Sequence, residues 1–326
     1  MTKILITGTS GFIGNHLLHF LIKQDLNVLG IDIVPPQDNQ YLPFFKQTDL
    51  LELGNLITTV QQFQPDFIFH LAARTDLNET KDIRGYASNI DGVENLIAAI
   101  RQTPSVKRCI FTSSQLVCKV GYVPKDENEY NPNNLYGESK VLTEKIVREN
   151  DGGGVEWCIV RPTTVWGPGM SSHYQRFLKM VNQGRYFHIG NSSLYKSYSY
   201  IGNIVYQYKM LMESPSELIN KKTFYLADYS PISLHHWIDL IQEEMGAKPV
   251  PTYPEGLMRF LAIFGDILST IGVKKFPFNT FRLNNILTEY TFDLSETEKI
   301  CGELPFSIEE GVKELVIWLK NEKIIT

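Results

Sequence analysis

The sequence KILITGTSGFIG, at residues 3–14, predicts the fold of the first part of this chain. Residues 3–6 are an apolar run typical of a buried strand, and three glycines follow with the spacing Gly-x-x-Gly-x-x-Gly. Over residues 16–22 the apolar side chains recur with helical periodicity. A strand, a glycine-rich turn and a helix can cradle a phosphate, because glycines let the backbone approach and the helix N-terminus offers free N–H groups. The alternative is a tight strand–helix turn without a ligand.

A second apolar run, residues 28–31, ends in Asp32, about 20 residues beyond the glycines, where dinucleotide-binding folds place an acid. This carboxylate would accept hydrogen bonds from the ribose hydroxyls of an adenine dinucleotide. It would repel a 2′-phosphate, and Ile33 and Val34 offer no basic group to receive one. The pattern therefore favours NAD over NADP, with a solvated acid at a strand end as the alternative.

Apolar runs continue to alternate with helical patterns, which predicts an α/β fold with a Rossmann-type doubly wound parallel sheet. Ligands of such sheets lie beyond the carboxyl ends of the strands, and Ser114 follows one of these ends. The other expected strands are 65–73, 108–112, 157–160 and 224–227, and the expected helices are 86–101, 136–149 and 234–245.

The regular alternation ends near Gly169. We therefore expect an NAD-binding Rossmann domain over residues 1–168, with returning segments near 203–228. Residues 169–326 should form mainly a smaller substrate-binding domain that is interleaved with the first.

Composition excludes several classes of function. Of the 326 residues 43% are hydrophobic and 21% charged, and the net charge of −5 gives no support for a nucleic-acid surface. The four scattered cysteines predict buried thiols in a reducing compartment, with neither disulfides nor a metal site. The first strand starts at residue 3 and no apolar run reaches about 20 residues, so we expect no signal peptide and no membrane span. A cytoplasmic location follows.

Tyr136 and Lys140 are four residues apart at the start of an apolar-periodic run. On a helix this spacing puts both side chains on one face, one turn apart. Holding a tyrosine as phenolate near pH 7 requires its pKa to fall by about 3 units, or roughly 4 kcal/mol. A cation about 4 Å away, at an effective dielectric constant near 20, supplies roughly 4 kcal/mol. The pair could therefore transfer protons near neutral pH, although the spacing alone is common in helices.

Taken in order, these motifs resemble the extended short-chain dehydrogenase/reductases, and more narrowly the NAD-dependent sugar epimerase/dehydratase group. The resemblance covers nearly the whole chain and includes His-Leu-Ala-Ala at 70–73 and Arg-Pro at 161–162. It implies a catalytic triad in which Tyr136 is the base, Ser114 hydrogen-bonds the same sugar oxygen, and Lys140 binds the nicotinamide ribose. His70 is expected to be structural, and Asn89 to have a structural and proton-relay role. The implied NAD contacts are Gly8, Ser10, Gly11, Phe12, Ile13, Gly14, Asp32, Asp49, Leu50, Leu71, Ala72, Ala73, Asn89, Tyr136, Lys140, Pro162 and Thr163.

Departures from the family pattern narrow the reaction. Where the 4,6-dehydratases place an Asp-Glu pair after the serine, this chain has Gln115 and Leu116, which disfavours elimination of water. Thr164 stands where many epimerases carry an asparagine that touches the sugar. The implied substrate contacts in the first domain are Arg74 and Thr164.

The second half is similar to bacterial 4-epimerases that act on undecaprenyl-diphosphate-linked N-acetylglucosamine, chiefly at residues 195–205 and 253–275. Lys196 occupies the place where soluble epimerases put an arginine on the diphosphate, and Arg282 falls near their second one. Either could instead be a solvated surface charge.

Residues 257–273 are apolar around most of a helical circumference and precede Lys274 and Lys275. Such a helix could lie in a membrane interface with the lysines near anionic headgroups. Equally, it could be buried against the second domain or a partner subunit. The family resemblance also suggests a homodimer through the helices 86–101 and 136–149.

The sequence therefore predicts an NAD-dependent 4-epimerase that transiently oxidises C4 of a diphosphate-linked N-acetylhexosamine, with a polyprenyl carrier preferred, for surface-polysaccharide synthesis. It would be cytoplasmic or peripheral at the inner face of the membrane. The alternatives are a soluble UDP- or GDP-sugar 4-epimerase or 4-ketoreductase and, less favoured, a non-catalytic NAD-binding regulatory protein.

Overall fold

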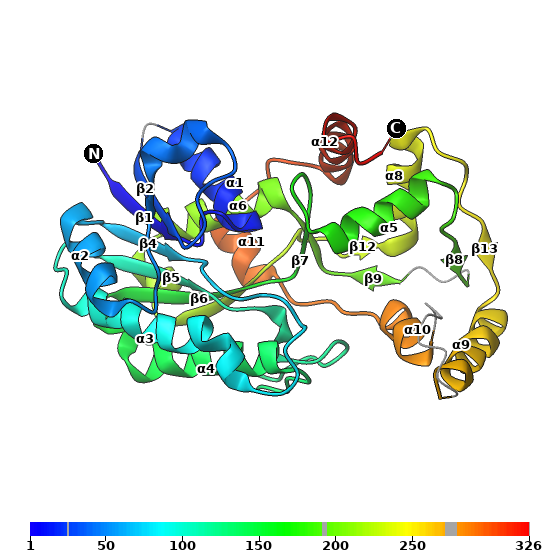
Figure 1. The fold of residues 1–326 in the computed structure, drawn as a ribbon, viewed down its shortest axis with the longest axis horizontal. Helices are drawn as coiled ribbons and strands as arrows, with labels where there is room; N and C mark the ends of the chain where they lie inside the picture. The colour runs from blue at the N-terminus through cyan, green and yellow to red at the C-terminus, as the bar shows by residue number, and fades with distance from the viewer. Residues whose placement is uncertain (25, 191–193, 271–278, 326) are drawn as a thin grey trace. The chain divides into compact units, whose positions relative to one another are not determined.

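Seven parallel strands form one sheet, in the spatial order β11 (Lys222–Leu226), β6 (Glu156–Pro162), β5 (Arg108–Thr112), β4 (Phe67–His70), β1 (Lys3–Thr7), β2 (Asn27–Asp32) and β3 (Phe45–Gln47) (Figure 1). The order reverses between β1 and β4, the place where doubly wound sheets bind ligands. The predicted Rossmann-type sheet is confirmed. The computed structural model describes residues 1–24, 26–190, 194–270 and 279–325, without the side chains of 268–270, 281 and 282.

Helices cover both faces of the sheet, as a doubly wound fold requires. On one face α2 (Leu53–Phe63), α3 (Ala87–Arg101) and α4 (Leu135–Glu149) pack side by side. On the other, α6 (Ile201–Glu213) contacts α1 (Phe12–Ile22) and α11 (Ser295–Cys301). Short helical turns complete the unit: η1 (Asn39–Phe44), η2 (Ile83–Tyr86), η3 (Gln115–Val117), η4 (Asp151–Gly153) and α7 (Ser216–Ile219).

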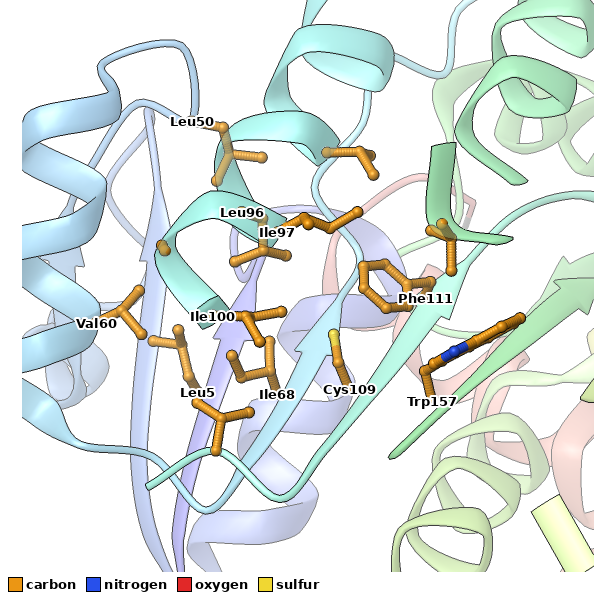
Figure 2. Packing of buried hydrophobic residues seen from close by; sticks show 14 of the residues in the cluster. Leu5, Leu50, Val60, Ile68, Leu96, Ile97, Ile100, Cys109, Phe111 and Trp157 are labelled. Atoms are coloured by element: carbon orange, nitrogen blue, oxygen red, sulfur yellow. The ribbon is translucent and has the colours of Figure 1, made fainter. Parts of the chain in front are cut away.

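The main core lies between the sheet and α2, α3 and α4. Figure 2 shows Leu5, Ile68 and Phe111 of neighbouring strands meeting Ile97 and Ile100 of α3, and all five are buried. Burying each such side chain stabilises the fold by about 1.5–3 kcal/mol. Because strands of a doubly wound sheet are covered on both faces, they form continuous apolar runs, which is why they are visible in the sequence.

The chain divides into two compact units. Unit 1 comprises Met1–Val165, Ser199–Tyr229 and Asp293–Pro305, and unit 2 comprises Trp166–Tyr198, Ser230–Phe292 and Phe306–Thr326. Residues 293–305 thus belong with the sheet, although the sequence-based division left them in the second part. The roles assigned to the two parts stay predictions.

Unit 2 is built from helices and two-residue strands. β12 (Ile232–Ser233) pairs with β9 (Tyr195–Lys196), and β13 (Thr252–Tyr253) pairs with β8 (His188–Ile189). Two further short strands, β7 (Thr164–Trp166) and β10 (Tyr198–Tyr200), each span a point at which the chain passes from one unit to the other. The helices of unit 2 are α5 (Ser172–Asn182), α8 (Leu234–Met245), α9 (Glu255–Thr270), α10 (Thr280–Leu287) and α12 (Ile308–Asn321).

Some helix boundaries differ from those expected. The first helix begins at Phe12 instead of residue 16, so the last glycine of the motif lies in its first turn. The helix expected from residue 86 begins at Ala87, because Ile83–Tyr86 forms a tighter 3₁₀ turn. The helix expected over 257–273 is α9, and residues 271–273 lie outside the described residues. Within the described ranges, no helix is both long enough and apolar enough to cross a membrane.

The β1–α1 turn depends on three residues without side chains. Gly8 has φ +79°, and a Cβ there would lie 2.6 Å from the Ala72 backbone N. A Cβ on Gly14 would lie 2.1 Å from the Gly8 carbonyl oxygen. The Gly11 N–H donates to that same carbonyl at 3.1 Å, which closes the turn. The close packing of β1, the turn and the end of β4 therefore leaves no room for a methyl group.

We expect Gly14→Ala to lower the free energy of unfolding by about 1–3 kcal/mol, because the new methyl must displace backbone. Gly54→Ala is the matched control, since a Cβ on this helical glycine of α2 meets nothing within 4 Å. It should be neutral or stabilising by up to about 1 kcal/mol. Urea unfolding measures both, and equal midpoints for the two variants would contradict the packing argument.

Candidate active site

The β1–α1 turn presents backbone N–H groups at the start of a helix. No side chain caps α1, whose N-cap is Gly11, so the first-turn N–H groups are available to an anion. The predicted cofactor residues Ser10 to Gly14 therefore lie together in one uncapped turn. This arrangement fits the pyrophosphate of a dinucleotide.

Asp32, at the end of β2, lies beside this turn. Its Oδ2 accepts from the Ser10 N–H at 3.0 Å and its Oδ1 from the Val34 N–H at 3.1 Å. These bonds fix the carboxylate, and the neighbouring Ile33 and Val34 side chains are both more than half exposed and uncharged. The geometry suits a ribose diol, and the ribose contact itself stays a prediction.

The end of β4 adjoins the turn through Thr7. The Thr7 hydroxyl accepts from the Leu71 and Ala72 N–H groups at 3.2 and 3.1 Å and contacts His70 Nδ1 at 2.9 Å. Burial lowers the pKa of His70 to about 3, so its imidazole is neutral. This contact and the neutral ring support the structural role that we expected for His70. Leu71 and Ala72, two predicted cofactor contacts, are brought next to Gly8.

Two further predicted cofactor residues follow β3. Leu50 is buried in the main core, and its carbonyl accepts from the Asn95 amide at 2.8 Å. Asp49 Oδ1 accepts from the Leu51 N–H at 2.9 Å. These contacts explain the local structure, and cofactor contact there stays a prediction.

Asn89 joins the end of β4 to α4. Its Oδ1 accepts from the Arg74 N–H at 2.7 Å, and its Nδ2 donates to the Arg74 carbonyl at 3.0 Å and to Ser139 Oγ at 2.9 Å. Ser139 lies between Tyr136 and Lys140 in α4. Both ends of the amide are engaged, which supports the structural part of the expected role.

The predicted triad comes together where β5 ends and α4 begins. Ser114 caps η3, accepting from the Leu116 N–H at 3.1 Å, so its own hydroxyl hydrogen can be donated. The Ser114 hydroxyl acts on the Tyr136 phenol and lowers its pKa. Tyr136 and Lys140 lie one turn apart in α4 and are only 7% and 3% exposed.

Gly137 makes this junction close enough, and the sequence analysis missed it. A Cβ there would lie 2.3 Å from the Leu116 carbonyl oxygen. Any larger residue would push the start of α4 away from η3, and with it Tyr136 from Ser114. A glycine directly after the tyrosine was the available signal.

Burial dominates the electrostatics of the pair. It raises the pKa of Tyr136 to about 12, and only the hydrogen bond from Ser114 opposes this rise. Burial also lowers the pKa of Lys140 to about 8, with Glu144 acting in the opposite direction. The Lys140 ammonium donates to the Thr112 carbonyl at 2.9 Å. The lowered tyrosine pKa that catalysis requires stays a prediction for the protein with its cofactor bound.

The predicted residues after β6 have well-defined partners in unit 1. Thr163 Oγ1 lies 3.3 Å from Ser199 Oγ, and Pro162 ends β6. Thr164 Oγ1 accepts from the Gln115 amide at 3.2 Å, so two of the positions that depart from the family pattern touch each other.

Arg74, a predicted substrate contact, is engaged inside the protein. Its Nε and one terminal nitrogen donate to Asp76 at 2.7 and 3.2 Å, and the other donates to the Gly85 carbonyl at 2.8 Å. Its charge is thus already paired, and a substrate role stays a prediction.

In unit 2, Lys196 is buried, and its Nζ donates to the Asn285 carbonyl at 2.9 Å. Burial lowers the pKa of Lys196, and no carboxylate opposes that effect among the described residues. Asn285 belongs to α10, the helix that also carries residue 282. The Arg282 side chain lies outside the description.

The four cysteines are free and buried, as predicted. Among the described residues, no group of three or more His, Cys, Asp or Glu side chains is arranged to hold a metal ion.

Comparison with known proteins places this geometry in context. The profile of the NAD dependent epimerase/dehydratase family matches residues 4–227. An N-acetyl-α-D-glucosaminyl-diphospho-ditrans,octacis-undecaprenol 4-epimerase of Escherichia coli O157:H7 is 26% identical over 319 residues, covering 95% of this chain and 93% of that protein. A decarboxylating sterol-4-α-carboxylate 3-dehydrogenase of Schizosaccharomyces pombe is 26% identical over 348 residues, covering 99% of both. The solved UDP-glucose 4-epimerase of Thermotoga maritima has the same fold, with a TM-score of 0.75 at 21% identity, covering 99% of this chain and 100% of that one.

We expect Lys140→Met to stabilise the cofactor-free protein at pH 7 by about 2 kcal/mol. The fall of the Lys140 pKa from 10.5 to about 8 corresponds to a burial cost of about 3 kcal/mol. The variant also loses the hydrogen bond from Lys140 to the Thr112 carbonyl, which reduces its net stabilisation by about 1 kcal/mol. Since the folded-state pKa is depressed, the native protein regains stability as pH rises from 8 towards 10.5, and the gain from the variant should shrink there.

Urea unfolding at pH 7 and at pH 10 measures this difference. Lys145→Met, an exposed lysine on the same helix, is the control and should show no such pH dependence. A Lys140→Met variant that is less stable than the native protein at every pH would contradict the assignment of the burial cost.

Proposed function

The chain belongs to the NAD dependent epimerase/dehydratase family, and on that premise we propose that it is a 4-epimerase of an N-acetylhexosamine linked through diphosphate to a polyprenol. It is an NAD-dependent epimerase of the extended short-chain dehydrogenase/reductase class, and NAD is its cofactor. The observation that carries the proposal is the contact of Ser114 with Tyr136, one helical turn from Lys140, at the carboxyl edge of the sheet. The uncapped turn and Asp32 fit the pyrophosphate and the adenosine ribose.

The chain's own residues supply proton transfer and orientation. NAD, which the β1–α1 turn and Asp32 would hold, would supply a reversible hydride acceptor for C4 of the sugar. Tyr136 takes the proton of the C4 hydroxyl, while the Ser114 hydroxyl donates a hydrogen bond to the same oxygen. Since the pKa of Tyr136 is about 12 without cofactor, the positive charges of the nicotinamide and of Lys140 must favour the phenolate in the loaded enzyme. Tyr136 then returns the proton when the 4-keto sugar is reduced on its other face.

The contacts of unit 1 disfavour dehydration. An elimination needs an acid and a base beside the sugar, in addition to the tyrosine. Gln115 holds one of the positions and is bonded to Thr164. Glu144, which bonds Ser113 next to the catalytic serine, has both oxygens engaged by buried donors. Reversible oxidation is therefore the chemistry that we assign.

Lys196 supports a diphosphate in the substrate. A buried ammonium is costly unless an anion accompanies it, and among the described residues Lys196 donates only to the neutral Asn285 carbonyl. The described residues thus leave two of its three donors for a ligand. We propose that this ammonium binds the diphosphate and that Arg282 of α10 assists.

The E. coli relative by its name acts on a polyprenol-linked sugar, and this is the source of the proposed carrier. A soluble UDP- or GDP-sugar 4-epimerase or 4-ketoreductase remains the first alternative. The equal identity with the sterol 3-dehydrogenase supports a second candidate, oxidation of a sterol hydroxyl. The intact Ser114–Tyr136 contact argues against a non-catalytic role.

We expect the protein with NAD to convert polyprenyl-diphosphate N-acetylglucosamine to its 4-epimer without net formation of NADH. UDP-N-acetylglucosamine and a 3β-hydroxysteroid are tested in parallel, with analysis of the released sugar and of NADH absorbance. Turnover of the UDP sugar alone would remove the lipid proposal, and steady NADH formation on the steroid would favour the dehydrogenase. Tyr136→Phe should be inactive in each case.

With the accepted substrate, Lys196→Met should raise KM about 10-fold or more and leave kcat within a few-fold, since it removes one or two charge-assisted bonds of about 1.5–3 kcal/mol. Lys179→Met, an exposed lysine of α5 in the same unit, is the control. An unchanged KM for Lys196→Met would contradict the diphosphate assignment.

The helix α9 supports work at a membrane surface. Met258 and Ala262 are buried against Leu283 of α10 in one cluster of unit 2. The opposite face is exposed and apolar, with Phe260 68% accessible, and no acid interrupts it. Arg259 at its edge is paired with Glu255 at 2.7 Å, and the Lys-Lys pair at 274–275 in the sequence suits anionic headgroups. The exposed side chains are Leu257, Phe260, Ile263, Phe264 and Ile267.

We therefore propose that the protein docks peripherally, through α9, on the cytoplasmic face of the membrane. It should sediment with phosphatidylethanolamine–phosphatidylglycerol vesicles, and Phe260→Ser/Ile267→Ser should reduce the bound fraction about 10-fold or more. Ile317→Ser, an exposed apolar residue of α12, is the control. Unchanged vesicle binding together with a loss of dimer in analytical ultracentrifugation would assign the face to a second copy instead.

A homodimer through α3 and α4 remains our prediction. The two helices pack side by side. Among the described residues of these helices, Leu142 is the one large apolar side chain that is exposed.

A further inference from the structure

Glu144 lies in α4 directly behind the catalytic pair, and the proposed reaction does not use it. Its side chain is fully buried, and its carboxylate accepts four hydrogen bonds. Arg161 of β6 donates to both carboxylate oxygens at 2.8 Å, and the guanidinium is itself buried. Ser113 donates to Oε1 at 2.6 Å and Tyr130 to Oε2 at 3.0 Å.

These bonds join the two elements that carry the triad. Glu144 lies one turn beyond Lys140 and two turns beyond Tyr136, on the same face of α4. Ser113 is the residue before Ser114, and its backbone N–H donates to the Val160 carbonyl of β6 at 2.7 Å. The Ser113–Glu144 bond therefore ties the backbone beside Ser114 to the helix that holds its partner.

A buried ion pair contributes little net stability, because desolvation of both charges offsets their attraction. Such a pair can instead hold one arrangement of the elements that it connects. Another ion pair joins β6 to its neighbour β5, where Arg108 of β5 meets Glu156 of β6 at 2.6 Å. That pair lies at the amino ends of the strands, away from the triad.

Resting on the proposed hydride-transfer function, we propose that Glu144 is a positioning residue that, through Ser113, sets the approach of Ser114 to Tyr136. The Ser114 bond favours the phenolate form of Tyr136. Weakening this hydrogen bond would raise the pKa of Tyr136, so that the residue acts as a base only at higher pH. Glu144 thus acts on the rate of the chemical step without touching substrate or cofactor.

Ser113→Ala tests this link, because it removes one bond and leaves the ion pair with Arg161 in place. We expect kcat to fall about 5- to 30-fold with KM unchanged, as for the loss of one oriented hydrogen bond. The limb of kcat that rises with pH should move upward by about 0.5–1 unit. Tyr130→Phe is the matched control, since it removes one bond to the same carboxylate from another side and should leave both quantities unchanged.

Glu144→Gln leaves the Arg161 charge unpaired and is compared with Glu156→Gln, which breaks the distant pair. Both should lower the urea midpoint, and only Glu144→Gln should lower kcat. Equal effects of Ser113→Ala and Tyr130→Phe on kcat, or an unchanged pH limb in Ser113→Ala, would overturn the positioning role.

The test does not depend on the identity of the sugar. The phenolate absorbance of Tyr136, obtained in the NAD-loaded protein as the difference from Tyr136→Phe, should titrate at higher pH in Ser113→Ala and unshifted in Tyr130→Phe. A shift seen without turnover of any sugar would refute the proposed substrate and keep the positioning role. Turnover of the sugar without a shift in the Tyr136 titration would refute the positioning role and keep the proposed substrate.

Discussion

Burial of the Lys140 ammonium beside the end of β5 is the constraint on which the rest of the site depends. At 3% exposure the charge has lost most of its water and has one carbonyl, that of Thr112, in exchange. Such a group persists only where the surrounding structure is rigid enough to hold it. Gly137 brings α4 against η3, Asn89 bonds Ser139, and Glu144 bonds Arg161. Burial of Lys140 thus costs stability at this junction, and these contacts keep Tyr136 and Lys140 desolvated.

The cofactor cradle and the triad share one edge of the sheet because parallel strands all end there. Gly8 follows β1, Leu71 and Ala72 follow β4, and Ser114 follows β5, so neighbouring strands deliver the cradle and the catalytic serine side by side. This edge belongs entirely to unit 1. The proposed oxidation of a secondary alcohol takes place at this edge, and the chain is 26% identical both to a sugar epimerase and to a sterol dehydrogenase.

The features that separate those substrates lie in unit 2. Lys196 and the exposed apolar face of α9 fit a ligand with a charged diphosphate and a lipid tail. A sterol would have no use for the ammonium, and a soluble nucleotide sugar would have none for the apolar face. This combination is our reason for proposing a lipid-linked sugar over a sterol or a soluble nucleotide sugar.

Much of the secondary structure of both units follows from the sequence alone. Strand 108–112 and helix 234–245 occur as predicted, and helix 136–149 begins one residue earlier, because their periodicity and stop signals are local. The spacing of Tyr136 and Lys140 likewise determines that they share a face. The start of α1 was missed by four residues, since glycines weaken the helical pattern where the cradle needs them.

Only the tertiary structure decided the electrostatics. The pKa of a group depends on how deeply the fold buries it. No local sequence pattern predicts that burial raises the pKa of Tyr136 and lowers that of Lys140. The partners of Glu144 come from residues 113, 130 and 161, which are far apart in the chain and meet only in the fold. The same holds for α9, whose sequence is apolar around most of its circumference. Packing against α10 determines which side is buried and leaves the other exposed.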